Sequence, residues 1–273
     1  MKYWIKQMGF CILMTASVIT GCSAQNDTSS TMDKQMREMK SAEARANERA
    51  SNELVAFMSF DTMFADSQLR ALARAAGKGQ IERVRSLVDQ GADVNAQGAR
   101  GATALFWAMR EGSVRGFRTL LELGANPNIV FEDGGTVMHW AVRNGSPAYL
   151  EAVLEHDGNP NLKAGQFNKT PLFEALGERR DRLDLLFAAG ANVNADSDLG
   201  TPAYVAARRG SFDVVYRLLE HGADYRMESS AGQTLIEIAV EKKSMMDPSH
   251  ELYRWLERVI DWLEARGEEV SVD

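Results

Sequence analysis

The sequence predicts an all-α protein, built as a solenoid of stacked helix-turn-helix units that are joined by hairpin loops. Threonines recur at intervals of 33, 34, 31 and 33 residues, and glycines recur at intervals of 33, 34, 32 and 32 residues. Two independent markers with a shared period indicate a repeat architecture much more specifically than one short motif does. The threonines are Thr103, Thr136, Thr170, Thr201 and Thr234, and the glycines are Gly91, Gly124, Gly158, Gly190 and Gly222.

Each marker has a physical role in such a unit. Threonine is a favourable N-cap for a first helix, and the proline that follows it in two units suits the first helical position. Gly112, Gly145 and Gly210 interrupt the first helix and allow the turn into a second one. The second helix shows helical apolar spacing and ends at the marker glycine, which accepts the left-handed capping conformation. We therefore expect each unit to be helix, turn, helix and hairpin loop.

The residues around the markers resemble the ankyrin-repeat family. The run GADVN at 91–95 recurs as GANPN at 124–128 and as GANVN at 190–194. The family's Thr-Pro-Leu-His start is similar to TPLF at 170–173. The resemblance covers about residues 66–232 and implies a curved ankyrin-repeat solenoid. In this family the surface of first helices and hairpin tips usually binds a protein partner.

The boundaries of the repeat domain follow from composition. Dense apolar positions begin at Leu54, and we expect an N-terminal cap and the start of the first helix pair at 54–78. Ankyrin repeats are expected at 79–232, and a divergent C-terminal capping repeat at 233–273. The caps are needed because the end units of a solenoid otherwise expose their apolar faces.

The amino terminus has the pattern of a secretory signal. Lysines precede a short apolar run at 9–20, which is too short for a membrane-spanning helix of about 20 residues. The end of this run, ITGC at 19–22, resembles the lipobox of bacterial lipoproteins. That resemblance implies a signal peptide at 1–21, lipidation of Cys22, and outer-membrane sorting because serine follows. The alternative is an ordinary signal that is cleaved near Ala24.

Residues 22–53 are expected to be a lipidated tether followed by a charged linker. Residues 23–31 are small and polar, and residues 32–53 are charged and contain neither glycine nor proline. The second part is compatible with either a solvated helix or a coil. The chain is therefore expected to be lipid-anchored in a bacterial envelope, on the periplasmic side of the outer membrane.

Charge and motifs exclude several functions. The net charge of -7 and the pI of 5.3 disfavour nucleic acid and anionic lipid, so we expect membrane contact through the lipid anchor only. The four histidines form no metal-ligand pattern, and no nucleophile elbow or phosphate-binding loop is present. We expect no enzymatic activity, no cofactor and no metal.

Tryptophan and arginine mark the candidate binding surface. When the units are aligned, one variable position of the first helix holds Trp107 and Trp140, and a position three residues later holds Arg110, Arg143 and Arg208. Both residue types dominate the energetics of protein interfaces. The alternative is that each tryptophan packs against its neighbouring helix as part of the core.

Two aromatic residues lie in successive hairpin loops, at Phe131 and Phe167. Apolar loop tips are unusual and suggest contact with a partner. The alternative is that the two rings pack on each other.

The resemblance also suggests a biological role. The chain is similar to lipid-anchored bacterial ankyrin proteins, some of which neutralise phospholipases or other effectors delivered between cells by type VI secretion. The leading hypothesis is an immunity protein whose rigid surface occludes such a secreted antibacterial lipase or phospholipase. The alternative is a scaffold or adaptor in envelope assembly or periplasmic stress defence.

The lipobox interpretation predicts the result of changing one residue. Cys22→Ala removes the thiol to which the lipid would be attached, so the variant should lose palmitate labelling and leave the membrane fraction. Labelling and fractionation at wild-type levels would show that Cys22 is not the anchor.

Overall fold

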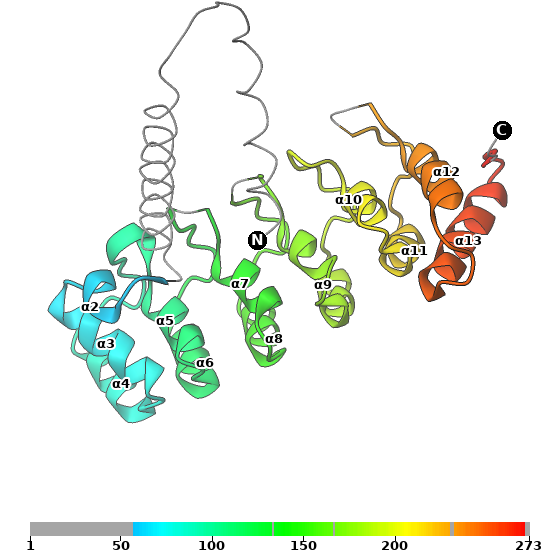
Figure 1. Cartoon of the computed structure of the whole chain (residues 1–273). Helices are drawn as coiled ribbons and strands as arrows, with labels where there is room; N and C mark the ends of the chain where they lie inside the picture. Colours follow the sequence, from blue (N-terminus) through cyan, green and yellow to red (C-terminus); the bar gives the residue numbers. More distant parts are fainter. Residues whose placement is uncertain (1–56, 133, 166, 230–231, 271–273) are drawn as a thin grey trace, which may run out of the picture. The chain divides into compact units, whose positions relative to one another are not determined.

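Pairs of antiparallel helices follow one another along the chain in the computed structural model (Figure 1). The structure describes residues 57–132, 134–165, 167–229 and 232–270, all of them in one unit of the chain. The predicted signal peptide at 1–21, the lipidation site Cys22 and the linker at 22–53 lie outside the described residues. The helices are α2 (Phe60–Met63), α3 (Ser67–Gly77), α4 (Ile81–Asp89), α5 (Ala104–Arg110), α6 (Val114–Glu122), α7 (Val137–Arg143), α8 (Ala148–Glu155), α9 (Leu183–Ala188), α10 (Pro202–Arg208), α11 (Phe212–Glu220), α12 (Leu235–Met245) and α13 (Glu251–Glu264), with short 3₁₀ helices η2 (Ala99–Gly101), η3 (Pro171–Ala175) and η4 (Arg180–Arg182).

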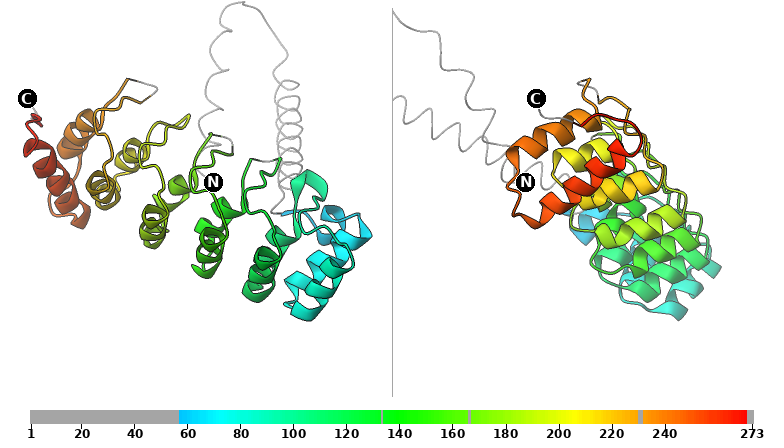
Figure 2. Two further views of the ribbon diagram at one scale, coloured as in Figure 1. Left: turned by 180° about the vertical axis from the view of Figure 1, so that it is seen from behind. Right: turned by 90° about the vertical axis from the view of Figure 1, so that its right-hand side faces the viewer.

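The helix pairs are arranged as a stack. The first helices α3 and α5 pack on each other, as do α10 and α12, while the second helices α4, α6 and α8 form a parallel row. Figure 2 shows the stack from behind and along its length. Within the described residues there is no β-strand, and the hairpin loops hold one isolated bridge between Ala164 and Lys169. None of the described helices is long and apolar enough to cross a membrane.

The predicted N-cap role of threonine is confirmed in three units. Thr103, Thr201 and Thr234 each accept a hydrogen bond from a backbone N–H in the first turn of the following helix. At Thr234 the N3 residue Glu237 bonds back to the cap, which completes a capping box. These side chains satisfy backbone donors that a helix start leaves unpaired, and so they fix where each first helix begins.

One marker glycine is displaced by one residue from its expected place. Gly124 ends its second helix in the left-handed region with φ of 91°, but in the next unit Asp157, with φ of 57°, takes that conformation. Aspartate tolerates it better than most residues. Gly158 serves a different need, because a Cβ there would lie 2.4 Å from Cγ1 of Val153. The structural period across these units is therefore more regular than the glycine spacing.

Asparagine side chains connect the first five units of the stack. Nδ2 of Asn95 donates to the carbonyl of Gly124 at 3.1 Å, and Oδ1 of Asn95 accepts from the backbone N–H of Asn126 at 2.7 Å. The same pair of bonds recurs at the next three junctions, and at the last one Arg226 takes the asparagine position and bonds Glu268. The equivalent asparagines are Asn128, Asn161 and Asn194.

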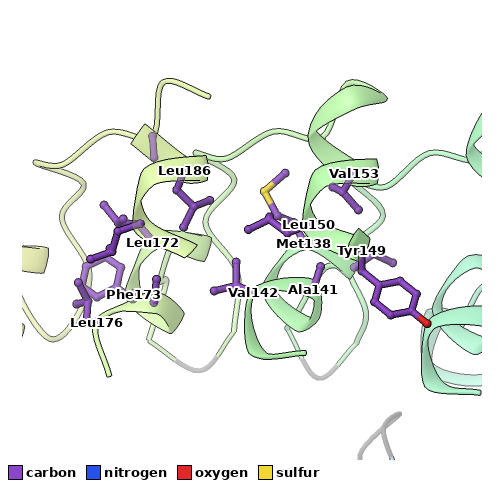
Figure 3. Close-up of a cluster of buried hydrophobic side chains, with 14 of the residues drawn as sticks. Met138, Ala141, Val142, Tyr149, Leu150, Val153, Leu172, Phe173, Leu176 and Leu186 are labelled. Atoms are coloured by element: carbon purple, nitrogen blue, oxygen red, sulfur yellow. The ribbon is translucent and has the colours of Figure 1, made fainter. Parts of the chain in front are cut away.

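The core is a continuous layer of apolar side chains between the units. Figure 3 shows Met138 and Val142 of α7 beside Leu150 and Val153 of α8, with the buried Leu172 and Leu186 in the next unit. Each unit thus buries its apolar face against its neighbour, as expected for a solenoid. The C-terminal end is covered by α13, whose apolar side is buried at Leu256, Val259, Ile260 and Leu263.

The fourth unit departs from the pattern. Its first helix is the 3₁₀ helix η3, and its turn contains the buried Arg182. Nη2 of Arg182 donates to the carbonyls of Asn144 and Gly145 at 3.3 and 3.1 Å, and its Nη1 pairs with Asp181. A cation therefore stabilises the carbonyl end of α7.

His139 gives the fold a dependence on pH. Its ring is buried, with Nε2 2.9 Å from the carbonyl of Lys169 and Nδ1 2.8 Å from Oγ1 of Thr136. The carbonyl can only accept, so Nε2 carries the proton and Nδ1 of the neutral ring accepts from the threonine hydroxyl. Burial lowers the pKa of His139 below its ordinary value of 6.5. The unfolded chain therefore binds a proton more readily than the folded chain does.

It follows that acidification below about pH 6.5 should lower the free energy of unfolding, until the folded pKa is reached. We expect Tm to fall between about pH 7 and about pH 5 and to fall less in His139→Gln. His156→Gln is the matched control and should keep the wild-type slope. Equal slopes for wild type and His139→Gln would contradict this account.

Candidate functional site

A hollow of about 290 Å³ opens between α5 and α7. Each helix contributes side chains at i, i+3 or i+4 spacing, which places them on one face. The stacking of adjacent first helices brings these two faces together. The residues that line this α5–α7 hollow are Phe106, Met109, Arg110, Trp140, Arg143 and Asn144.

Trp140 forms the partly exposed aromatic part of the hollow. Its ring packs against the Phe106 ring at a centroid distance of 5.7 Å, in a T-shaped arrangement. Its Nε1 is buried and has no hydrogen-bond partner among the described residues. Gly135 lies close to that nitrogen, since a Cβ there would be 3.0 Å away. The indole is thus held between the loop and Phe106, and the side chain is half-buried.

Arg143 lies over the indole. Its guanidinium carbon is 4.3 Å from the Trp140 ring centroid, a cation–π distance, and the side chain is exposed. Nε of Arg143 is 3.6 Å from Oε2 of Glu174, whose Oε1 is 3.0 Å from Nζ of Lys169. One carboxylate therefore serves two cations.

Arg110, on the α5 side of the hollow, is held by Trp107 and by the backbone of Met58. Its guanidinium lies 5.0 Å from the Trp107 ring, and its Nη1 donates to the carbonyl of Met58 at 2.5 Å. That acceptor is neutral, and no carboxylate in the described part of the chain forms an ion pair with Arg110. The guanidinium is therefore positioned without being neutralised.

Trp107 does not share the exposure of Trp140. It is 8% exposed and contacts the rings of Phe60 and Phe64 at 4.8 and 5.9 Å. Its indole also lies against Gly77, where a Cβ would be 2.8 Å from Nε1. The sequence predicted that Trp107 and Trp140 present one joint surface, but α2 covers Trp107. Trp107 therefore packs as core, the alternative that the sequence left open.

The two loop phenylalanines differ in burial and in their contacts. Phe131 is 1% exposed and packs on Phe106 at 4.9 Å, so it supports the hollow from beneath rather than presenting a contact at a loop tip. Phe167 is half-buried in the next loop, and its carbonyl accepts from the backbone N–H of Asp198. Arg208 is exposed on α10, outside the lining of the hollow.

Three lining residues were missed from the sequence: Phe106, Met109 and Asn144. Their equivalents in neighbouring units are core or turn residues, so residue type and spacing gave no signal for them. They line a hollow only because this pair of units leaves a gap at that point.

Comparison with known proteins identifies the repeats. The family model described as "Ankyrin repeats (3 copies)" matches residues 43–131, "Ankyrin repeat" matches 133–162, and "Ankyrin repeats (many copies)" matches 186–239. Ankyrin repeat and SOCS box protein 11 from Homo sapiens is 31% identical over 77 residues, which is 28% of this chain and 24% of that protein. The chain thus spans about a quarter of the length of the curated relatives that it matches.

Solved structures agree with the predicted all-α ankyrin solenoid. The ankyrin repeat domain of Bcl-3 has 25% identity and a TM-score of 0.60, covering 69% of this chain and 85% of that chain. An ankyrin repeat domain from Acinetobacter baumannii AYE has 25% identity and a TM-score of 0.58, and the match covers 68% of this chain and 96% of that chain. A third match is a chain from the complex of the predatory endopeptidase Bd0816 from Bdellovibrio bacteriovorus with immunity protein Bd3460. It has 25% identity and a TM-score of 0.56, and the match covers 69% of this chain and 97% of that chain.

The different burial of the two tryptophans predicts different effects of their removal. Trp107→Ala should lower the free energy of unfolding by about 3–5 kcal/mol, as truncation of a buried tryptophan does. Trp140→Ala should have a clearly smaller effect, because part of its ring is already in water. Denaturant unfolding of the two single variants measures this difference, and equal losses would show that both residues are core.

Proposed function

Because this chain belongs to the ankyrin-repeat family, whose repeats bind other proteins, we propose that it is a non-enzymatic immunity protein that binds and occludes a toxic secreted enzyme. The observation that carries the proposal is the α5–α7 hollow. It offers a partly exposed tryptophan next to two arginines, Arg110 and Arg143, on the first-helix surface. Aromatic and arginine side chains in such pockets dominate binding energy.

A structural neighbour supports the proposal. One chain of similar fold comes from a complex in which an immunity protein is bound to a predatory endopeptidase. Ankyrin stacks are therefore found in complexes of this kind. For the present chain we propose a toxic hydrolase of the cell envelope. A phospholipase is the class that the resemblance to anchored bacterial ankyrin proteins favours.

The proposed location is the outer membrane, with the repeats facing the periplasm. The support is the lipobox-like run that ends at Cys22 and the linker at 22–53. More than one acyl chain is needed for stable anchoring, and lipoprotein modification supplies them. Anchoring would concentrate the inhibitor at the surface that an envelope hydrolase attacks.

Occlusion is the mechanism that suits this structure. The stack is held by a continuous core and by repeated bonds between units, so little order is lost when it binds. A rigid surface can cover the mouth of an active site without any chemistry of its own. The alternative, an envelope scaffold with an endogenous partner, would use the same surface. Deletion of a scaffold would not make the strain sensitive to a toxic enzyme from its siblings.

The test is a competition between isogenic strains. A strain that lacks this chain should be killed by wild-type siblings in contact, and wild-type protein should restore survival. We expect the double variant Trp140→Ala/Arg143→Ala to remain folded but to restore little or no protection. Arg254→Ala, an exposed change on α13, is the matched control and should protect fully.

Two outcomes would overturn the proposal. The deletion strain would survive contact unharmed if the chain is a scaffold instead. A folded hollow variant that protects as well as wild type would remove the α5–α7 hollow from the binding surface. Circular dichroism of the purified variants confirms folding before either result is interpreted.

A further inference from the structure

We propose that the α5–α7 hollow receives an acidic segment of the partner, with one apolar side chain in the hollow and carboxylates on Arg110 and Arg143. This inference rests on the proposed function and specifies the chemistry of the partner at the same surface. It is carried by the shape of the hollow and by the charge around it.

The floor of the hollow is apolar. Phe106 and Met109 are almost fully buried and Trp140 is half-buried, so the remaining accessible surface consists of ring and thioether edges. The volume of about 290 Å³ lies just below the range for ligand pockets, roughly 300–1,000 Å³. A hollow of that size suits one large apolar side chain rather than an extended ligand.

The rim of the hollow carries excess positive charge. Arg110 is bonded to the neutral carbonyl of Met58, and Arg143 shares Glu174 with Lys169. Of these three cations, Arg143 and Lys169 share the carboxylate of Glu174, and Arg110 has no ion-pair partner among the described residues. Both arginines have guanidinium nitrogens left to bond a carboxylate, which arginine binds with two parallel N–H donors.

The positive charge continues along the same edge of the first helices. Arg74 of α3 and Arg208 and Arg209 at the end of α10 are exposed, and none of them has an ion-pair partner among the residues that the structure describes. Besides Glu174, acidic residues beside these arginines include Glu111 and Glu178, and Glu241 of α12 stands at the repeat position of Arg208. The whole chain has a net charge of -7, so the positive charge of this edge is opposite in sign to the net charge of the chain.

This distribution changes the partner expected from bulk charge alone. A net acidic chain attracts basic partners at long range, but salt screens that attraction beyond about 8 Å. At contact distance the partner meets arginines. The complementary surface is therefore acidic where it touches the hollow.

Nucleic acid is a poorer match for the same arginines. Single strands bind along a basic groove with several aromatic residues that stack on successive bases. The hollow offers one partly exposed indole, and the acidic remainder of the chain repels a phosphate backbone. A protein segment with a few carboxylates satisfies the arginines without that repulsion.

The test uses short fluorescein-labelled peptides and the full chain, with binding followed by fluorescence anisotropy. One peptide has a Phe flanked on both sides by Asp and Glu. A second replaces the acids by Asn and Gln, and a third replaces the Phe by Ala. We expect the acidic Phe peptide to bind about tenfold or more tightly than either of the others, and its affinity to fall as salt rises.

Charge reversal locates the interaction. Arg110→Glu/Arg143→Glu should weaken binding of the acidic Phe peptide about tenfold or more. Arg83→Glu/Arg254→Glu, on α4 and α13, makes the same change in net charge and should leave binding near the wild-type level. Equal binding of the acidic and amide peptides, or equal weakening by the two double variants, overturns the inference.

Two further arms separate the alternatives. If a labelled single-stranded oligonucleotide binds more tightly than the acidic peptide and depends on Arg110 and Arg143, the surface recognises nucleic acid and the inference is wrong. If no peptide binds while the hollow variant Trp140→Ala/Arg143→Ala still loses protection in cell competition, the proposed function stands and the acidic partner chemistry fails.

Discussion

The asparagine that bridges neighbouring units at four successive junctions is the interaction on which the rest of this structure depends. In Asn95, Asn128, Asn161 and Asn194 the amide donates to the end of the next second helix and accepts from the loop that follows it. Each exposed bond contributes only about 1 kcal/mol net. The asparagine matters mainly for geometry, because two bonds from one planar amide fix both the distance and the rotation between neighbouring units. The apolar core supplies most of the stability, and the asparagines select one way of stacking it.

This constraint explains why a surface feature can be built from two helices with no direct hydrogen bond between them. The backbone at each loop sets where the following first helix begins, so α5 and α7 are held at a defined separation. The side chains then decide whether the gap is filled. On the α3 side, the Trp107 indole lies against Gly77 and beneath α2, and the gap is closed. On the α7 side, no equivalent segment of the described residues lies over Trp140, and the α5–α7 hollow remains.

The irregular units keep the same stacking by other means. Asp157 adopts the left-handed conformation that glycine provides elsewhere, and its carbonyl still accepts from Asn128. In the fourth unit the guanidinium of Arg182 binds the carbonyl end of α7. Arg180 and Arg217 reach the following and preceding units through Asp213 and Asp184. The connection between units is thus preserved where the helical pattern is weakest.

The sequence by itself determined the repeat, its helix starts and most of its helix ends, because N-caps, left-handed glycines and apolar spacing act within a few residues of chain. It also placed Arg110, Trp140 and Arg143 on the surface that lines the hollow. Only the tertiary structure decided which tryptophan is exposed, since Trp107 is covered by Phe60 and Phe64 from a segment more than forty residues earlier. It also decided that Phe131 packs beneath the hollow and that Asp157 replaces a glycine. Repeat-equivalent residues have the same local sequence environment, and burial depends on what distant chain lies over each of them.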